Sequence, residues 1–175
     1  MSARLVLGPM LRYVDAAEAT IWVETDAPCE AEALGHTAST FTVSDHHYAL
    51  IVISGLEPGR TYSYEVRLDG ELVWPPFGSA LPPSEIHTLD PAKALQVAFG
   101  SCRVAVPQGP PYSLTKREDP RGRGPDALAA LAHRMLADPT HRPELLLLLG
   151  DQVYADDVPP ATEAFIRSRR HADGE

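Results

Sequence analysis

The chain has 175 residues and a net charge of -9, with 44% hydrophobic and 22% charged residues, a composition ordinary for a globular protein of two small domains. The negative charge is concentrated in residues 1–90, which hold thirteen Asp and Glu against four Lys and Arg, whereas residues 91–175 hold eleven of each. This distribution argues against nucleic acid and against an anionic membrane as partners.

The first residues contain no apolar core of the kind found in signal peptides, and no apolar stretch has the length of a membrane span. Cys29 and Cys102 fall in different expected domains, so we predict no disulfide between them. We therefore expect a cytoplasmic protein.

Residues 1–90 carry the pattern of an antiparallel β-sandwich. Short alternating runs at 20–24, 48–53 and 61–68 predict strands, and Asp69-Gly70 is a strong hairpin signal. Tyr62 follows a turn, at the position where the tyrosine corner of a sandwich forms a hydrogen bond back to that turn. The pattern resembles fibronectin type III repeats.

Proline-rich segments and a linker at 89–94 then predict a domain boundary, which gives domains 1–90 and 91–175. The second domain begins with a β-α-β pattern: strands at 95–99 and 145–149, with a helix at about 125–136 between them. The five leucines of 145–149 are typical of a strand buried on both faces, as in parallel sheets. The predicted apolar face of the helix consists of Leu128, Leu131 and Met135.

Both strands end on residues that can bind metal. The first is followed by Gly100-Ser101-Cys102-Arg103, and the second by Gly150 and Asp151, with Tyr154 three residues later. Neighbouring strands lie about 5 Å apart, and sites in open parallel sheets lie beyond their carboxyl ends. Thiolate, carboxylate and phenolate together favour ferric iron, and the second oxygen of Asp151 suits a harder ion. Two such ions are a common means of hydrolysing phosphate esters.

At these positions the chain resembles a known family. Residues 99–103 and 150–156 are similar to the PhoD-like alkaline phosphatases and phosphodiesterases of the metallophosphatase superfamily, which are related to purple acid phosphatases. The resemblance implies a phosphate ester substrate and a ferric ion (Fe3+) bound by Cys102, Asp151 and Tyr154, with Asp151 bridging to Ca2+. It also implies a small β-sandwich before the metal domain.

Two other chemistries do not fit Cys102. A cysteine-nucleophile phosphatase needs an arginine six residues after the cysteine, but that position holds Gln108, and Pro107 before it lacks an amide hydrogen. A P-loop is excluded as well, because no glycine-rich run ends in Lys-Ser or Lys-Thr.

Several charged residues have two interpretations each. Arg103 is a candidate substrate-binding residue, or it pairs with a carboxylate. The loop at 110–124 either presents its basic residues to a phosphate or is solvated; these residues are Lys116, Arg117, Arg121 and Arg123. Asp156 and Asp157 either support the metal site or cap the next helix, and we favour the cap.

A complete metallophosphatase site takes further ligands from later strands, including an Asn-His segment that does not occur here. Two parallel strands do not make a covered sheet. We therefore expect an N-terminal portion of a larger catalytic domain, inactive or nearly so alone, whose partner is the remainder of that domain or a complementing chain. The alternative is a binding module that uses the β-sandwich and keeps a remnant metal motif. Burial of 145–149 by the chain's own helices would favour this alternative.

Overall fold

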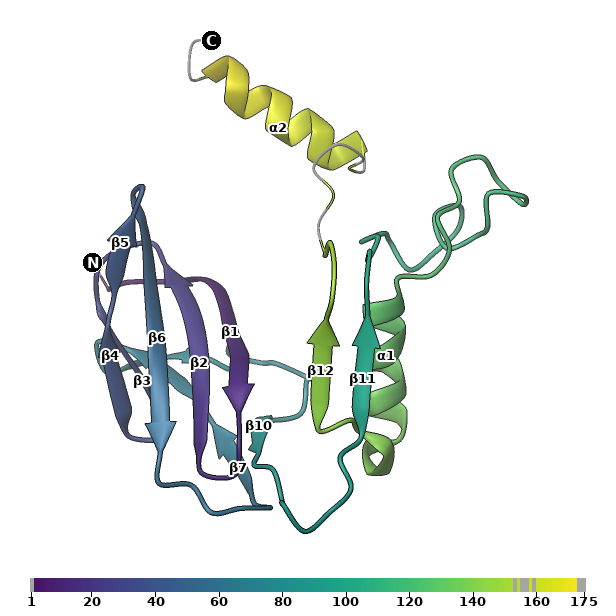
Figure 1. Cartoon of the computed structure of the whole chain (residues 1–175). Helices are drawn as coiled ribbons and strands as arrows, with labels where there is room; N and C mark the ends of the chain where they lie inside the picture. The colour runs from purple at the N-terminus through teal and green to yellow at the C-terminus, as the bar shows by residue number, and fades with distance from the viewer. Residues whose placement is uncertain (1, 153, 155–157, 159, 173–175) are drawn as a thin grey trace. The chain divides into compact units, whose positions relative to one another are not determined.

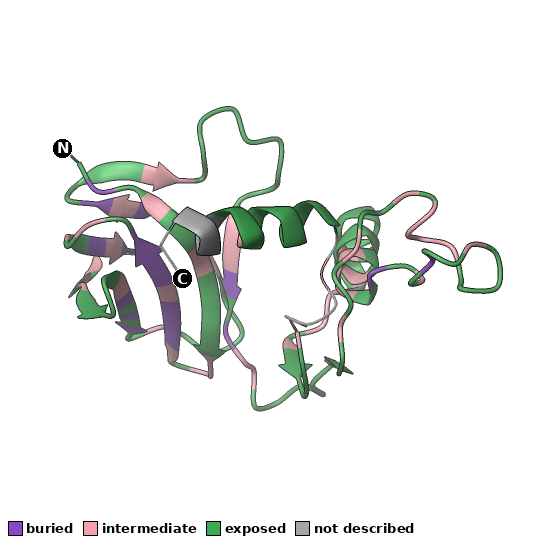
Figure 2. Ribbon diagram, turned by 90° about the horizontal axis from the view of Figure 1, so that it is seen from above, coloured by how far each residue is buried: buried purple, intermediate pink, exposed green. Residues whose placement is uncertain are grey.

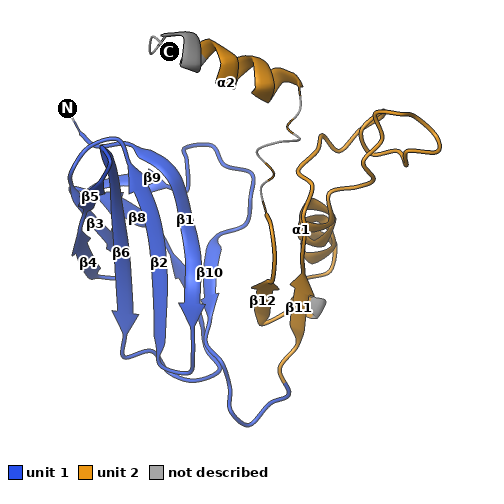
Figure 3. Ribbon diagram, turned by 45° about the horizontal axis from the view of Figure 1, so that its top comes forward, with its two compact units in different colours: residues 1–94 blue, residues 95–175 orange. Residues whose placement is uncertain are grey.

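The computed structural model describes residues 2–152, 154, 158 and 160–172. It consists of two compact units, Met1–Ala94 and Leu95–Glu175 (Figure 3). The expected boundary, between residues 90 and 91, lies shortly before this division. The described fold is mostly antiparallel β-sheet with few helices.

The first unit is built from antiparallel strands (Figure 1). One four-stranded sheet has the order β1-β2-β6-β5, a second has the order β4-β3-β8-β9, and β10 pairs with β7. The strands are β1 (Leu5–Val14), β2 (Glu18–Thr25), β3 (Glu30–Ala33), β4 (His36–Ser39), β5 (Phe41–Val43), β6 (His46–Ser54), β7 (Thr61–Tyr64), β8 (Val66–Leu68), β9 (Glu71–Trp74) and β10 (Ser84–His87).

Alternation along the strands builds the core of this unit. In β2 and in residues 49–53 of β6 every second residue is small or β-branched and buried, and Figure 2 shows these strands coloured by burial. The register places Ile21 opposite Ile51. Val66 and Leu68 of β8 bring the second sheet into the same buried cluster. Two antiparallel sheets that share one core are compatible with a β-sandwich.

Two local predictions in this unit are confirmed. Asp69 and Gly70 form the β8–β9 turn with φ of 48° and 83°, the positive values that a tight hairpin requires. The backbone N–H of Glu57 donates to the hydroxyl of Tyr62 at 2.8 Å, which is the expected bond from the tyrosine to its turn. The predicted strand at 61–68 is instead two strands, because β7 pairs with β10 whereas β8 pairs with β3 and β9.

The second unit contains the expected β-α-β order, with β11 (Val97–Gly100), α1 (Ala127–Ala137) and β12 (Leu145–Leu148). A 3-10 turn, η1 (Pro139–His141), precedes β12, and a further helix, α2 (Pro160–Ala172), follows it. The two strands are parallel, with Val97 opposite Leu145 and Gly100 opposite Leu148. No helix in the described part of the chain is both long and apolar enough to cross a bilayer.

Helix α1 forms because alanine and leucine, both strong helix formers, dominate its sequence. It begins two residues later than expected, since Asp126 is the N-cap and accepts hydrogen bonds from the N–H groups of Leu128 and Ala129. Its predicted apolar face is half-buried at Leu128, Leu131 and Met135.

The prediction that strand 145–149 is covered on both faces is wrong for the described residues. Leu146, Leu147 and Leu148 are all exposed, and Leu149 is 64% exposed. The physical reason is that, among the described elements of the second unit, helix α1 is the only helix that lies along the β11–β12 pair (Figure 1). A run of five leucines predicts that a strand needs apolar cover on both faces, but it does not predict which segment provides that cover.

Replacing Ile51 by Ala should lower the free energy of unfolding by about 2–5 kcal/mol, because its side chain is fully buried. Val52→Ala is the matched control, since Val52 follows directly in β6 and is 47% exposed; it should cost less than about 1 kcal/mol. Urea denaturation followed by tryptophan fluorescence measures both, because both tryptophans lie in the first unit. Equal losses would contradict the placement of Ile51 in the core.

Candidate metal site

The site is organised by the ends of the two parallel strands. After the last paired residues, Leu149 N–H donates to the carbonyl of Gly100 at 2.9 Å. The N–H of Arg103 then donates to the carbonyl of Asp151 at 2.8 Å. The two segments that follow the strands are thus joined by backbone hydrogen bonds, and Cys102 and Asp151 lie within this joined region.

Cys102 occupies a backbone conformation that is unusual for its side chain. Its φ is 56°, in the left-handed region that favours glycine, and its side chain is exposed. A non-glycine residue in this region costs conformational energy, and such residues cluster at functional sites. The strain marks Cys102 as a candidate functional residue independently of the sequence motif.

Hydrogen bonds at the Cys102 sulfur favour its anionic form. The hydroxyl of Ser101 lies 3.1 Å from Sγ and lowers the pKa of the thiol, and the hydroxyl of Tyr154 lowers this pKa further. The charge of Asp151 opposes the shift, while the backbone N–H of Asp151 supports it. The net direction is a lowered pKa, so the thiolate, which is the form that binds metal, is stabilised.

The structure therefore brings the three predicted ligands together. The hydroxyl of Tyr154 lowers the pKa of the Cys102 thiol, and the backbone of Asp151 is joined to the residue that follows Cys102. Their donor types, thiolate, carboxylate and phenolate, suit a ferric ion. Within the described residues no group of three or more His, Cys, Asp and Glu side chains is arranged to hold a metal ion. Metal binding by Cys102, Asp151 and Tyr154 therefore stays a prediction.

Gly150 allows the two strand ends to approach each other. A Cβ atom at this position would collide with Oγ of Ser101 and would lie 3.2 Å from Cβ of Ser101. Because glycine has no Cβ, the segment that carries Asp151 can pass directly beside Ser101. Ser101 was not predicted as part of the site, and its position directly before Cys102 was the only signal available.

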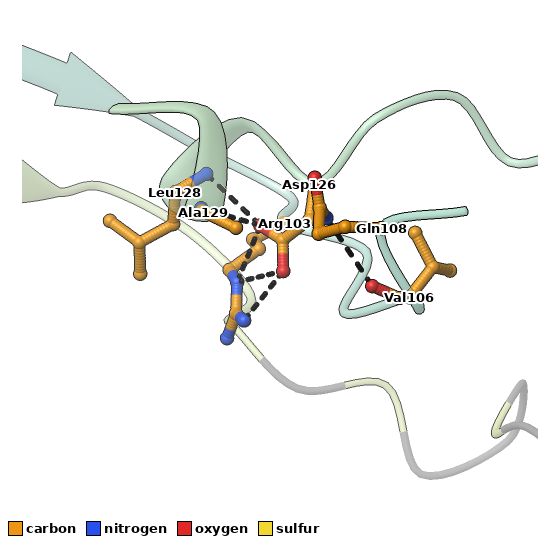
Figure 4. Close-up of polar contacts among 6 residues, drawn as sticks. All are labelled: Arg103, Val106, Gln108, Asp126, Leu128 and Ala129. Atoms are coloured by element: carbon orange, nitrogen blue, oxygen red, sulfur yellow. Dashed lines mark hydrogen bonds and ion pairs between the residues drawn. The ribbon is translucent and has the colours of Figure 1, made fainter. Parts of the chain in front are cut away.

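Arg103, the predicted substrate-binding residue, pairs with a carboxylate (Figure 4). Its Nη2 lies 2.7 Å from Oδ2 of Asp126, and its Nε lies 3.0 Å and 3.2 Å from the two carboxylate oxygens. This contact holds the pKa of the Asp126 carboxyl below its ordinary value. The remaining nitrogen, Nη1, makes no hydrogen bond within the described residues, so a substrate role for Arg103 stays a prediction.

The basic loop folds on itself. The N–H of Arg123 donates to the carbonyl of Tyr112, and the N–H of Gly124 donates to that of Leu114. Arg121 forms a two-point ion pair with Asp119, which lowers the pKa of Asp119 to about 2. Lys116 and Arg117 are exposed. Asp156 and Asp157 lie outside the described residues.

An apolar hollow of about 240 Å³ lies between α1 and the strand pair, beside Cys102. Its wall combines the half-buried face of α1 with one face of the sheet and the start of the Cys102 segment. The residues that form it include Ala98, Cys102, Leu128, Leu131, Leu146 and Leu148. Cys102 therefore borders an apolar surface.

Comparison with known proteins reaches the first unit only. Residues 2–86 match the model of a domain of unknown function, DUF7800. No curated protein and no solved structure matches the chain significantly. The first unit is thus similar to a recurrent domain, and the matched residues end before the segment that carries Cys102.

Replacing Gly150 by Ala should force the Ser101 hydroxyl away from its position and weaken its bond to the Cys102 sulfur. We expect a higher thiol pKa at Cys102, measured from the pH dependence of its alkylation rate. Gly109→Ala is the control, because a Cβ there would meet no atom within 4 Å. The same alkylation profile in wild type and Gly150→Ala would contradict this role of Gly150.

The Arg103–Asp126 pair should make stability depend on pH. The folded pKa of Asp126 is lowered, so its stabilising contribution is present above its ordinary pKa and is lost as the pH falls through the folded value. The difference in melting temperature between wild type and Asp126→Asn should therefore shrink from about pH 6 to about pH 3 and below. Circular dichroism measures both melts. A difference that grows as the pH falls would show that this carboxylate does not contribute as described.

Proposed function

We propose that the second unit is the opening portion of a metal-dependent phosphoesterase that hydrolyses phosphate monoesters or diesters. The observation that carries this proposal is the convergence of Cys102, Asp151 and Tyr154 at the adjoining ends of two parallel strands. The likeness of residues 99–103 and 150–156 to the PhoD-like alkaline phosphatases supports it. In this proposal the first unit is the fibronectin type III-like sandwich that precedes the metal domain.

Cys102, Asp151 and Tyr154 would hold a ferric ion, and the second carboxylate oxygen of Asp151 is suited to calcium. Two such ions supply charge neutralisation and an activated water when they are bound. The chain's own groups prepare this site: the hydroxyls of Ser101 and Tyr154 stabilise the thiolate of Cys102. Arg103 is oriented by Asp126 and keeps Nη1 for a substrate oxygen.

The proposal includes further ligands supplied by the remainder of a catalytic domain or by a complementing chain. Two observations support this. Three donors are a partial ligand set for two ions. The apolar side chains of β12 are also exposed in the part of the chain that the structure describes, although a leucine-rich parallel strand requires cover on both faces.

A binding role for the first unit is the second candidate, and one observation favours it. The outer face of the β1-β2-β6-β5 sheet carries exposed apolar side chains such as Leu50 and Val52, and the rings of Trp22 and Tyr48 stack on it with centroids 5.7 Å apart. An open hollow of about 710 Å³ lies on this face. Its lining residues are Met10, Arg12, Tyr13, Thr20, Trp22, Phe41 and Leu50. Exposed apolar surface of this kind often marks an interaction site.

The first test is metal binding by the purified chain. Reconstitution with ferric iron should give a visible charge-transfer band from the tyrosinate of Tyr154, and Tyr154→Phe should abolish that band. Cys102→Ser should lower iron affinity by about tenfold or more, because a soft anionic ligand is replaced by a neutral hydroxyl. Absorption spectroscopy and metal analysis measure these effects.

Tyr112→Phe is the matched control, since Tyr112 belongs to the same unit but lies in the basic loop; the charge-transfer band should remain in this variant.

Isothermal titration of the iron-loaded chain with inorganic phosphate then tests the phosphoesterase part of the proposal. Colourless protein that holds no iron would contradict the metal site. If the chain binds iron but the iron-loaded chain does not bind phosphate, the proposed metal site stands and the proposed phosphoesterase function is contradicted.

A further inference from the structure

Asp126 is the most constrained carboxylate of the second unit. It is 3% exposed, and its two oxygens accept hydrogen bonds from Nε and Nη2 of Arg103 and from the backbone N–H groups of Leu128 and Ala129 (Figure 4). Charge-assisted two-point contacts of this kind are strong and directional. The carboxylate therefore fixes the guanidinium of Arg103 to the first turn of helix α1.

Arg103 is anchored at its backbone as well. Its N–H donates to the carbonyl of Asp151 at 2.8 Å, so one residue contacts the helix through its side chain and the Asp151 segment through its main chain. Arg103 directly follows Cys102, whose φ of 56° is unfavourable for a non-glycine residue. Such a conformation persists only where the surrounding structure holds it. We infer that Arg103, fixed through its side chain and its backbone, holds the conformation of Cys102 from the C-terminal side.

We propose that Asp126 is a positioning residue of the candidate metal site. By holding Arg103, it keeps Cys102 in its left-handed conformation beside Asp151 and Tyr154. The part of this inference that concerns metal affinity rests on the proposed function. The part that concerns the joined strand ends does not.

The chain contains a matched control. Asp119 forms the same kind of two-point ion pair with Arg121, at 3.0 Å and 2.9 Å, but this pair lies within the basic loop. Asp126→Asn and Asp119→Asn therefore remove the same charge from the same type of contact. In Asp126→Asn the side-chain oxygen can still cap α1, because asparagine is as good an N-cap as aspartate.

The first measurement is amide hydrogen exchange by NMR on the metal-free 175-residue chain. Asp126→Asn should lower the protection of the position 103 amide by about tenfold or more, because the segment after Cys102 loses its anchor. Asp119→Asn should leave this protection unchanged. Arg103→Gln breaks the same contact from the other side while Asp126 remains the helix cap, and it should reproduce the loss. Unchanged protection in both Asp126→Asn and Arg103→Gln overturns the inference.

The second measurement is titration of the same variants with ferric nitrilotriacetate, followed by visible absorption. Asp126→Asn should bind iron about ten- to a hundredfold more weakly than wild type, the range found when a supporting partner of a metal ligand is removed, and Asp119→Asn should match wild type. Equal iron affinity in wild type and Asp126→Asn overturns the inference. If the wild-type chain binds no iron, the proposed function is contradicted. The hydrogen-exchange data alone then decide whether Asp126 positions Cys102.

Discussion

The parallel pairing of β11 with β12 is the interaction on which the candidate site depends. Its register sets Gly100 opposite Leu148, so the two segments that follow the strands start at the same level of the sheet. The backbone N–H of Arg103 reaches the carbonyl of Asp151 because of this register. A shift by one residue would turn alternate side chains to the opposite face and separate the ligand positions. The hydrogen bonds of Ser101, Arg103 and Tyr154 refine an arrangement that the pairing first creates.

Features determined by local chemistry could be predicted from the sequence. Asp69 and Gly70 form a tight turn because they tolerate positive φ. Gly100 and Gly150 lie where β11 and β12 end and the candidate site begins. Contacts between distant residues could not be predicted. Arg103 and Asp126 are 23 positions apart, across a folded loop, and either alone has an ordinary explanation as a substrate contact or a helix cap. The exposure of Leu149 was missed for the same reason, since composition cannot name the covering segment.

The two units support different kinds of inference. The first is an antiparallel structure with a continuous core and a match to a domain of unknown function, and it carries exposed apolar side chains on one sheet face. The second holds an exposed thiol, Cys102, and a carboxylate, Asp126, that orients the arginine directly after Cys102. A metal-dependent activity is therefore proposed for the second unit, and a binding role for the first.

The open sides of the β11–β12 pair have a consequence for the behaviour of the chain in solution. Within the described residues each of these strands pairs only with the other, so each presents unpaired backbone groups along one side, next to exposed apolar side chains such as Phe99. An edge of this kind accepts a strand from another molecule without selecting for its sequence. Association of the chain with itself should therefore compete with any specific completion of the sheet, and the outcome depends on concentration as much as on affinity.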